Sequence, residues 1–215
     1  MLDSQFMSKQ LNNFLGLNRA IALKAIPFLA RTPLTPNMIT STSLFSGLVS
    51  AWLMSGGSRD GFLGGAFFLQ LSFILDNCDG GVARLKSLSS VFGMWFDFAA
   101  DLIVDFAIWI ALAFAVHARH SFPWAVPVAF AACVGSLINF IRVVSGRLQG
   151  KTGKELPPDP KNMLQSSLHI LSHDGDPTFF VWILALAGSP EYFLFLGCIY
   201  IHFIWIGSFI SDKFS

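Results

Sequence analysis

The sequence predicts an all-α integral membrane protein with six transmembrane helices, preceded by an amphipathic helix that lies in the membrane interface. Composition is the first observation behind this prediction: of 215 residues, 53 % are apolar and 13 % are charged, and the mean hydropathy is +0.60. The second observation is that the apolar residues form runs, most of them close to the roughly 20 residues that a helix needs to cross a bilayer. We therefore expect a juxtamembrane segment over residues 1–36 and one six-helix membrane domain over 37–215.

The N-terminal segment mixes apolar and basic residues. Over residues 6–31, apolar positions are interspersed with four basic ones, Lys9, Arg19, Lys24 and Arg31. This pattern is typical of a helix that lies on the cytoplasmic face of the bilayer with its apolar side down. The simpler alternative is a flexible basic tail. The first ten residues are polar and lack the pattern of a cleavable signal peptide.

The first two spans are expected on either side of a glycine-rich stretch. Pro33 and Pro36 interrupt the chain before a first span over about 37–56, and the stretch GGSRDGFLGG at 56–65 is interpreted as the turn that follows it. The next apolar run, 62–75, has only fourteen residues, which is short for a span. Its helix must therefore continue through 76–84, where the acidic residues begin.

Four more spans are expected farther along the chain. They cover about 95–116, 123–145, 178–188 and 191–210, and a polar segment over 146–176 separates the second pair from the first. The fifth span is short. Its helix either covers the bilayer thinly or begins earlier, near Met163, and kinks at Pro177.

The basic residues predict the orientation. Twelve of the 14 Lys and Arg residues lie in the N-terminal segment, in the turn after the second span, in the segment after the fourth span and at the C-terminus. Arg59 and Arg119 fall on the opposite side. Because Lys and Arg gather in cytoplasmic loops, we expect both termini and the acidic residues on the cytoplasmic side of the plasma (inner) membrane. The net charge of +1 gives no electrostatic argument for a nucleic-acid partner.

Residues 76–101 carry four carboxylates in an apolar neighbourhood: Asp76, Asp79, Asp97 and Asp101. A charge at membrane depth costs roughly 3 kcal/mol or more, so ionisable residues there are treated as functional. On helices, the first two aspartates share one face and the last two share another. Two such helices leaning together would form an oxygen-rich pocket, which hard divalent cations such as Mg²⁺ prefer. Two alternatives stay open: an acidic cation pathway, and simple pairing with basic side chains.

Small residues and one arginine extend this pattern. Gly80, Gly81, Ala83 and Gly93 remove side-chain bulk where another helix or a ligand could approach closely. Arg84 offers a fork of donors that suits a phosphate group. Together with the carboxylates, these residues predict an acid-lined, metal-dependent phosphate site.

Two positions outside this stretch also carry charge. Asp105, one turn beyond the last motif aspartate, either extends the polar site or hydrogen-bonds a neighbouring helix, and we favour the second. Arg142 belongs to a basic cluster with Arg147, Lys151 and Lys154 that would suit a phosphate-bearing substrate. Positive-inside topology alone would produce the same cluster.

The motif itself, Asp-x2-Asp-Gly-x2-Ala-Arg-x8-Gly-x3-Asp-x3-Asp, resembles the signature of the CDP-alcohol phosphotransferase family, also called CDP-alcohol phosphatidyltransferases. Eight signature positions are occupied, by Asp76, Asp79, Gly80, Ala83, Arg84, Gly93, Asp97 and Asp101. Within this family, the resemblance is greatest to the branch that contains di-myo-inositol phosphate phosphate synthases. It rests on two stretches, residues 31–37 and the beginning of the motif at residues 74–79.

The resemblance implies a reaction and its cofactors. A phospho-alcohol group, phosphatidyl or a polar-alcohol phosphate, moves from a CDP-alcohol to an acceptor hydroxyl and CMP is released, in phospholipid or related phosphodiester biosynthesis. Two divalent ions, Mg²⁺ or Mn²⁺, are implied, with Asp76, Asp79 and Asp97 as ligands. Asp101 is implied as a further ligand, and it is our expected general base. A homodimer in the lipid bilayer is also expected.

The resemblance also places the substrates. The expected donor-binding positions are Asp76, Asp79, Gly80, Ala83, Arg84 and Gly93. Asn37 and Thr40, at the start of the first span, are expected beside the nucleotide pocket, with a plain helix N-cap as the alternative. Arg142 is our expected contact for a phosphate-bearing substrate.

Two other classes of protein place acids in membrane helices. A UbiA-like prenyltransferase holds a Mg²⁺–diphosphate with paired aspartate motifs, but usually has more spans and lacks the Asp-Gly-x2-Ala-Arg string. A cation transporter would place its acids near the bilayer midplane, often in inverted repeats. Here the acids are expected at one end of their helices, and the sequence shows no repeat.

Overall fold

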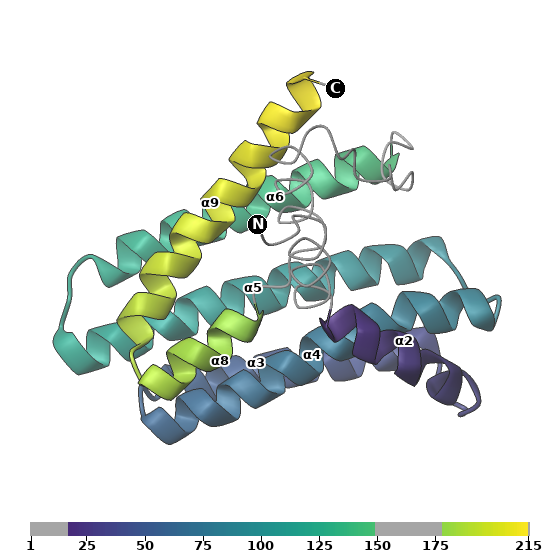
Figure 1. The fold of residues 1–215 in the computed structure, drawn as a ribbon, viewed down its shortest axis with the longest axis horizontal. Helices are drawn as coiled ribbons and strands as arrows, with labels where there is room; N and C mark the ends of the chain where they lie inside the picture. The colour runs from purple at the N-terminus through teal and green to yellow at the C-terminus, as the bar shows by residue number, and fades with distance from the viewer. Residues whose placement is uncertain (1–16, 149–177, 215) are drawn as a thin grey trace, which may run out of the picture.

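The computed structural model describes residues 17–148 and 178–214, and within these ranges every regular element is a helix (Figure 1). The helices are α2 (Leu17–Ala30), α3 (Pro36–Ser55), α4 (Arg59–Leu85), α5 (Val91–His120), α6 (Ala125–Leu148), α8 (Thr178–Ala187) and α9 (Pro190–Phe214). Five of them, α3, α4, α5, α6 and α9, are long and apolar enough to cross a membrane. The chain is thus a multi-pass membrane protein, as its composition predicts.

Two elements agree only in part with the expected layout. The described residues hold five candidate spans rather than the expected six. A short apolar element, as expected, lies at the fifth position, but α8 has only 10 described residues, too few to cross a bilayer. An earlier start near Met163 falls outside the described residues. Similarly, α2 covers only the second half of the helix expected over 6–31, and residues 6–16 lie outside the described part of the chain.

The glycine-rich stretch at 56–65 is not a turn throughout, and this expectation was wrong. The chain turns only at 56–58; Ser58 then caps α4 by accepting a hydrogen bond from the Gly61 backbone N–H at 3.1 Å. The glycines inside the helix allow close packing against α3. A Cβ at Gly61 would lie 2.5 Å from the Leu53 carbonyl oxygen, and one at Gly65 would lie 2.5 Å from Met54 Cγ. Packing between helices therefore overrides the turn propensity of glycine.

The third span is longer than the expected 95–116, because both of its ends are capped by serines. Ser90 accepts a hydrogen bond from the Gly93 backbone N–H at 3.0 Å, so α5 begins at Val91. Ser121 adopts a left-handed conformation (φ 51°) and donates its backbone N–H to the His117 carbonyl at 2.9 Å. These caps satisfy backbone groups that would otherwise lack partners at the helix ends.

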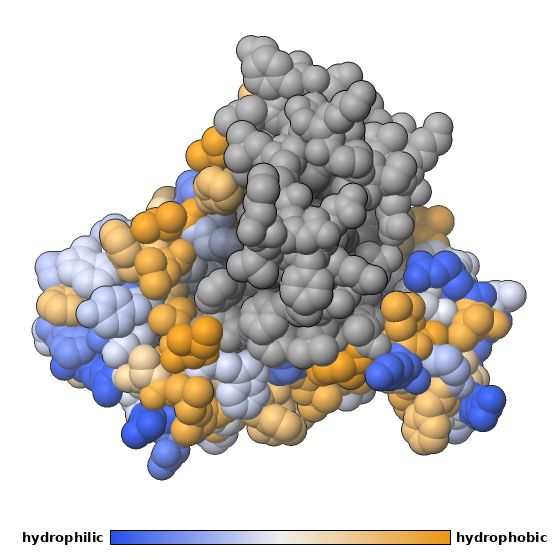
Figure 2. Space-filling view, viewed as in Figure 1, coloured by the Kyte–Doolittle hydropathy of each residue, from blue (hydrophilic) through white to orange (hydrophobic). Residues whose placement is uncertain are grey.

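α3 packs against both α4 and α5, whereas α5 in turn packs against α6 and α9. In Figure 1, α5 runs through the middle of the molecule, with α3, α4 and α8 on one side and α6 and α9 on the other. Apolar side chains are exposed on the face that Figure 2 shows. Large exposed apolar side chains of the described residues include Trp52, at 74 % exposure, and Phe130, at 71 %. Such exposure suits a lipid environment rather than water.

The acidic motif lies toward one end of its two helices. Asp76 is nine residues before the end of α4, and Asp101 is ten residues after the start of α5. At a rise of about 1.5 Å per residue, each is roughly 15 Å from the shared end. The start of α3 reaches the same region, because Thr40 contacts Asp79 there. Three helix ends thus build the site.

The crossing of α2 over α4 depends on Gly81. A Cβ at this glycine would clash with the Cδ1 atom of Ile26, which is buried in the contact between the helices. We expect Gly81→Val to destabilise the protein by about 1–3 kcal/mol through overpacking. The measurement is the midpoint of thermal unfolding in detergent.

Two further variants test this explanation. Gly80→Ala is the matched control, because its Cβ would meet only the Arg84 side chain, at 3.7 Å, and its unfolding midpoint should stay close to that of the wild type. The second is Gly81→Ala combined with Ile26→Ala, which should unfold at a higher temperature than Gly81→Ala alone. Equal unfolding midpoints for these two proteins would show that the contact with Ile26 is not the reason why position 81 requires glycine.

Candidate metal centre and active site

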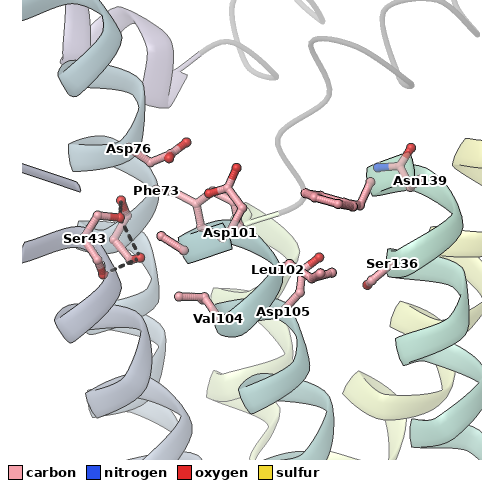
Figure 3. Close-up of a pocket in the computed structure, with 12 residues that line it drawn as sticks. Ser43, Phe73, Asp76, Asp101, Leu102, Val104, Asp105, Ser136 and Asn139 are labelled. Carbon is pink, nitrogen blue, oxygen red and sulfur yellow. Dashed lines mark hydrogen bonds between the residues drawn. The ribbon is translucent and has the colours of Figure 1, made fainter. Parts of the chain in front are cut away.

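A polar cavity of about 190 Å³ lies between α3, α4, α5 and α6 (Figure 3). Two of the predicted site residues line it, Asp76 and Asp101. Its other lining residues are Ser43, Ser72, Phe73, Ala100, Leu102, Val104, Asp105, Ser136, Asn139 and Phe140. The cavity therefore joins the acidic motif to polar side chains from two helices outside it.

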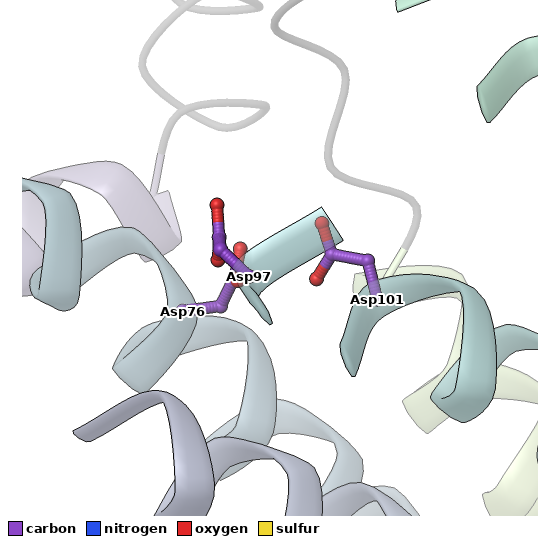
Figure 4. A group of neighbouring side chains, drawn as sticks. All are labelled: Asp76, Asp97 and Asp101. Carbon is purple, nitrogen blue, oxygen red and sulfur yellow. The ribbon is translucent and has the colours of Figure 1, made fainter. Parts of the chain in front are cut away.

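Three of the motif aspartates converge (Figure 4). Asp76 on α4 and Asp97 and Asp101 on α5 each place a carboxylate oxygen so that all three oxygens lie within 4.8 Å of one another. The first two side chains are half-buried, and the third is exposed. Oxygen ligands at this spacing fit a hard divalent cation, which coordinates carboxylates directly. The structure thus brings together three of the four acids that the sequence pattern singles out.

Asp79 lies beside this group but is held differently. It is buried, with 6 % of its surface exposed, and its Oδ2 accepts a hydrogen bond from Thr40 Oγ1 at 2.5 Å. The Gly80 backbone N–H donates to its other oxygen. Asp97 lies within hydrogen-bonding reach of both Asp76 and Asp79. The fourth carboxylate therefore connects to the cluster through Asp97.

The basic residues near the motif have separate tasks. Lys86 Nζ donates to the Thr32 and Leu34 carbonyl oxygens, each at 2.7 Å, and so ties the end of α4 to the loop between α2 and α3. Among the described residues, no Lys or Arg side chain forms an ion pair with Asp76 or Asp101. Buried or half-buried carboxylates need a compensating charge. A metal cation fits that need, and the donor set is the one it prefers.

The remaining motif positions lie around this cluster. Arg84 is exposed at the end of α4, and its charge acts on Asp79. Ala83 is half-buried. Gly93 is close to Asn37, since a Cβ at this glycine would lie 3.2 Å from Asn37 Oδ1. Predicted site residues from the first span and from the motif thus meet here.

Both interpretations of the start of the first span find support in the structure. Thr35 caps α3 by accepting a hydrogen bond from the Met38 backbone N–H at 3.3 Å, with Pro36 at the first helical position. Thr40, in contrast, is buried and reaches the acidic motif through its side chain. The cap and the site therefore use different residues of one short stretch.

Arg142 is half-buried on α6, one turn beyond Asn139, and is not among the described residues that line the cavity. Its expected contact with substrate phosphate stays a prediction. Of its cluster, Lys151 and Lys154 lie outside the part of the chain that the structure describes, and so does the side chain of Arg147.

Asp105 has both of the properties weighed for it from the sequence. Its side chain lines the cavity (Figure 3), and Ser136 on the neighbouring α6 lies close enough to stabilise its carboxylate. Trp109 Nε1 donates to the same serine hydroxyl at 3.0 Å. Asp105 therefore extends the polar region one turn beyond the motif while linking α5 to α6.

Sequence reasoning did not find the polar residues that line the rest of the cavity. Ser43 Oγ donates to the Ser72 carbonyl at 2.8 Å, and Ser72 Oγ donates to the Ser43 carbonyl at 2.9 Å. These residues, with Ser136 and Asn139, are polar positions within apolar spans. Their place in those spans was the available signal, because polar side chains in a membrane helix need partners.

Two solved structures that are similar to this chain are of the same protein. The match is to a phosphatidylinositol phosphate synthase of Mycobacterium tuberculosis in complex with manganese and citrate, with a TM-score of 0.46, 20 % identity, and coverage of 87 % of this chain and 88 % of that one. Its apo form matches with a TM-score of 0.44 and 19 % identity, over 86 % of this chain and 95 % of that one.

Curated relatives match over shorter stretches. A bifunctional IPC transferase and DIPP synthase of Aquifex aeolicus is 36 % identical over 123 residues, which are 57 % of this chain and 27 % of the relative. A CDP-diacylglycerol–serine O-phosphatidyltransferase of Helicobacter pylori is 40 % identical over 70 residues, 33 % of this chain and 28 % of the relative. The match therefore spans little more than a quarter of the length of each relative.

The family model for CDP-alcohol phosphatidyltransferases matches residues 33–157, more than half of the chain. That range contains the whole acidic motif, the start of α3 that contacts it, and the cavity residues up to Phe140. It confirms the resemblance first seen in the motif. With its eight signature residues, its convergent carboxylates and this match, the chain belongs to the CDP-alcohol phosphatidyltransferase family.

Proposed function

We propose that this protein transfers a phospho-alcohol group from a CDP-alcohol to an acceptor hydroxyl and releases CMP. The observation that carries the proposal is the convergence of Asp76, Asp97 and Asp101 within 4.8 Å, in a chain of this family. The acids belong to one motif but come from two helices that α3 holds together. Structural pairing alone would predict basic partners for Asp76 and Asp101, and among the described residues neither forms an ion pair with a Lys or Arg side chain.

Divalent ions fit the carboxylates. Asp76, Asp97 and Asp101 would hold one ion, and Asp79 would share a second with Asp97, which lies beside it. Mg²⁺ and Mn²⁺ are the ions proposed, since both accept carboxylate oxygens together with water or phosphate. When bound, they would neutralise negative charge on the donor diphosphate and on the departing CMP.

The donor is proposed to lie over the end of α4 and the starts of α3 and α5. Gly80 and Ala83 leave space next to the carboxylates, and exposed Arg84 is free to turn its guanidinium to a phosphate. Gly93 and Asn37 meet at the side of this region. Thr40 orients Asp79, and Arg142 is proposed to contact a substrate phosphate from α6.

Asp101 is proposed as the general base. Its carboxylate belongs to the cluster and also lines the cavity, and its side chain is more exposed than those of Asp76 and Asp97. An acceptor hydroxyl in the cavity would thus reach a proton acceptor beside the donor phosphate. Removal of that proton, as the hydroxyl oxygen attacks the β-phosphorus, is the task of such a base.

The domain organisation, the orientation in the membrane and the oligomeric state are proposed on the same grounds as in the sequence analysis. Residues 37–215 form a catalytic domain with α8 completing six spans, and α2 lies in the cytoplasmic interface. Both termini and the metal centre face the cytoplasm, because Lys and Arg gather on that side. The protein is proposed to act as a homodimer in the plasma (inner) membrane.

The direct test is CMP release by the purified protein in detergent. The donors are CDP-diacylglycerol, CDP-inositol, CDP-choline and CDP-ethanolamine, each with a mixture of acceptor alcohols, with and without Mg²⁺ or Mn²⁺. We expect CMP only when a divalent ion is present and from one class of donor. The relatives' names include both a CDP-diacylglycerol enzyme and a DIPP synthase. The donor that yields CMP would therefore show to which branch of the family this protein belongs.

The proposal fails if no donor yields CMP in the presence of either ion. Metal-dependent binding of a prenyl diphosphate would then favour a prenyltransferase. Cation flux in liposomes would instead favour a transporter, in which the acids would form part of an ion pathway.

A further inference from the structure

We propose that the cavity beside the carboxylate cluster is the acceptor subsite, and that Asp105, Ser136 and Asn139 select a small uncharged alcohol with several hydroxyl groups. This inference rests on the proposed function, because it assigns the acceptor of that reaction. None of these three residues belongs to the family motif.

The size of the cavity fits a small molecule. Its volume of about 190 Å³ would hold about six water molecules at roughly 30 Å³ each. Pockets for drug-sized ligands are larger, about 300–1,000 Å³. The cavity can therefore take a compact alcohol, whereas a nucleotide must lie outside it, over the helix ends.

The position of the cavity places an acceptor next to the chemistry. Asp101 and Asp105 both line it from α5 and are one helical turn apart, about 6 Å between Cβ atoms. A small alcohol that contacts Asp105 would therefore present another hydroxyl near Asp101. This geometry requires at least two hydroxyl groups on one small molecule.

The hydrogen bonds around Asp105 leave it able to accept from a ligand. Trp109 Nε1 donates to Ser136 Oγ at 3.0 Å, so the serine hydroxyl directs its own hydrogen elsewhere. Ser136 lies close enough to Asp105 on the facing helix to stabilise its carboxylate. A carboxylate has about four lone-pair sites, so one serine hydroxyl can satisfy only one of them. Because Asp105 lines the cavity, a ligand there can donate to the carboxylate as well.

The mixture of donors and acceptors indicates hydroxyl groups in the ligand. Asn139 lines the cavity and offers both an NH₂ donor and a carbonyl acceptor, whereas Asp105 only accepts when ionised. A hydroxyl both donates and accepts, so several hydroxyls can satisfy this lining. An ammonium only donates and would leave the Asn139 donor without a partner.

The charge of the lining disfavours an anionic acceptor. Asp76, Asp101 and Asp105 all border the cavity. Divalent ions at the cluster would offset the first two, but Asp105 lies one turn farther along α5. A phosphate or carboxylate on the acceptor would meet its charge at short range, where repulsion costs several kcal/mol. An uncharged polyol avoids that repulsion.

The test compares acceptors in the wild type and in Asp105→Asn, which removes the charge but keeps the shape. The probes are glycerol and myo-inositol as uncharged polyols, glycerol 3-phosphate as the anionic alcohol and ethanolamine as the cationic one. Asp60→Asn is the matched control, since Asp60 is exposed at the opposite end of α4. Asn139→Ala provides a second variant if Asp105→Asn does not fold.

Two readouts are needed. The first is CMP release, from which the KM for the acceptor and the KM for the donor are measured separately. The second is the rise in the unfolding midpoint that each probe causes in the presence of Mg²⁺, which reports binding without turnover. We expect the wild type and Asp60→Asn to use and bind a polyol in preference to the other probes. In Asp105→Asn, we expect the polyol KM to rise about tenfold, equivalent to the loss of one hydrogen bond, and discrimination against glycerol 3-phosphate to fall.

The outcomes separate this inference from the proposed function. Polyol binding that is lost in Asp105→Asn, with no CMP from any donor, would support the subsite and overturn the reaction. CMP release with glycerol 3-phosphate or ethanolamine as the preferred acceptor would support the reaction and overturn the subsite. Equal loss of donor and acceptor use in Asp105→Asn, with unchanged acceptor preference, would show that Asp105 only links α5 to α6.

Discussion

Replacement of Asp101 by asparagine is expected to reduce metal-dependent CMP release by at least about 1,000-fold. Loss of a general base alone lowers rates by about 100- to 10,000-fold, and Asp101 also belongs to the carboxylate cluster. The side chain is exposed to the cavity, so its replacement by an amide of the same shape leaves the helix packing intact. The measurement is kcat with saturating donor, acceptor and metal.

A second variant separates the two roles of Asp101. Asp76→Asn removes a carboxylate that we propose as a metal ligand and not as the base, so its loss of activity should be partly reversed by a higher Mn²⁺ concentration. The activity of Asp101→Asn should not recover in this way, because the proton acceptor is missing. Asp60→Asn, far from the cluster, should retain wild-type activity. Retention of more than a tenth of wild-type kcat in Asp101→Asn would exclude this residue as the base.

Thr40→Val is expected to lower both metal affinity and kcat/KM by about 10- to 100-fold, the usual effect of losing a residue that orients a metal ligand. Thr40 donates to buried Asp79 at 2.5 Å, and valine keeps the shape of threonine without the donor. A buried carboxylate without this partner also destabilises the fold, by about 1–3 kcal/mol. Mn²⁺ titration and thermal unfolding measure the two effects.

The controls for Thr40 come from the same helix. Thr42 is exposed on α3 and donates to the Met38 carbonyl at 2.8 Å, so Thr42→Val removes a hydroxyl without touching the motif. Thr40→Ser restores the donor and should recover most of the metal affinity. If Thr40→Ser were as impaired as Thr40→Val, the hydrogen bond to Asp79 would not account for the role of this residue.

Local patterns were sufficient to predict much of this protein. The apolar runs predicted the spans that became α3, α4, α5, α6 and α9, because burial in a membrane demands long apolar helices. The short run before Asp76 predicted that α4 continues through the motif, and it ends at Leu85. Helical periodicity also predicted that Asp97 and Asp101 share a face, since residues four apart are neighbours on one helix.

Such patterns did not predict contacts between residues that are far apart in the sequence. Thr40 and Asp79 are 39 positions apart, and nothing in the spacing of either helix indicates that their faces meet. The glycines at 61 and 65 have the local signature of a turn, yet they pack inside α4 against α3. In both cases the partner helix decides the outcome.

The sequence by itself thus determined the membrane class, the spans, the acidic motif and the family. Each depends on composition, on the periodicity of a single helix or on the spacing of residues along the chain. Only the tertiary structure decided which carboxylates converge, that Lys86 holds a loop rather than the acids, and that Asp105, Ser136 and Asn139 line one cavity. The physical reason is that periodicity fixes the face on which a side chain lies, whereas packing among helices fixes what that face meets.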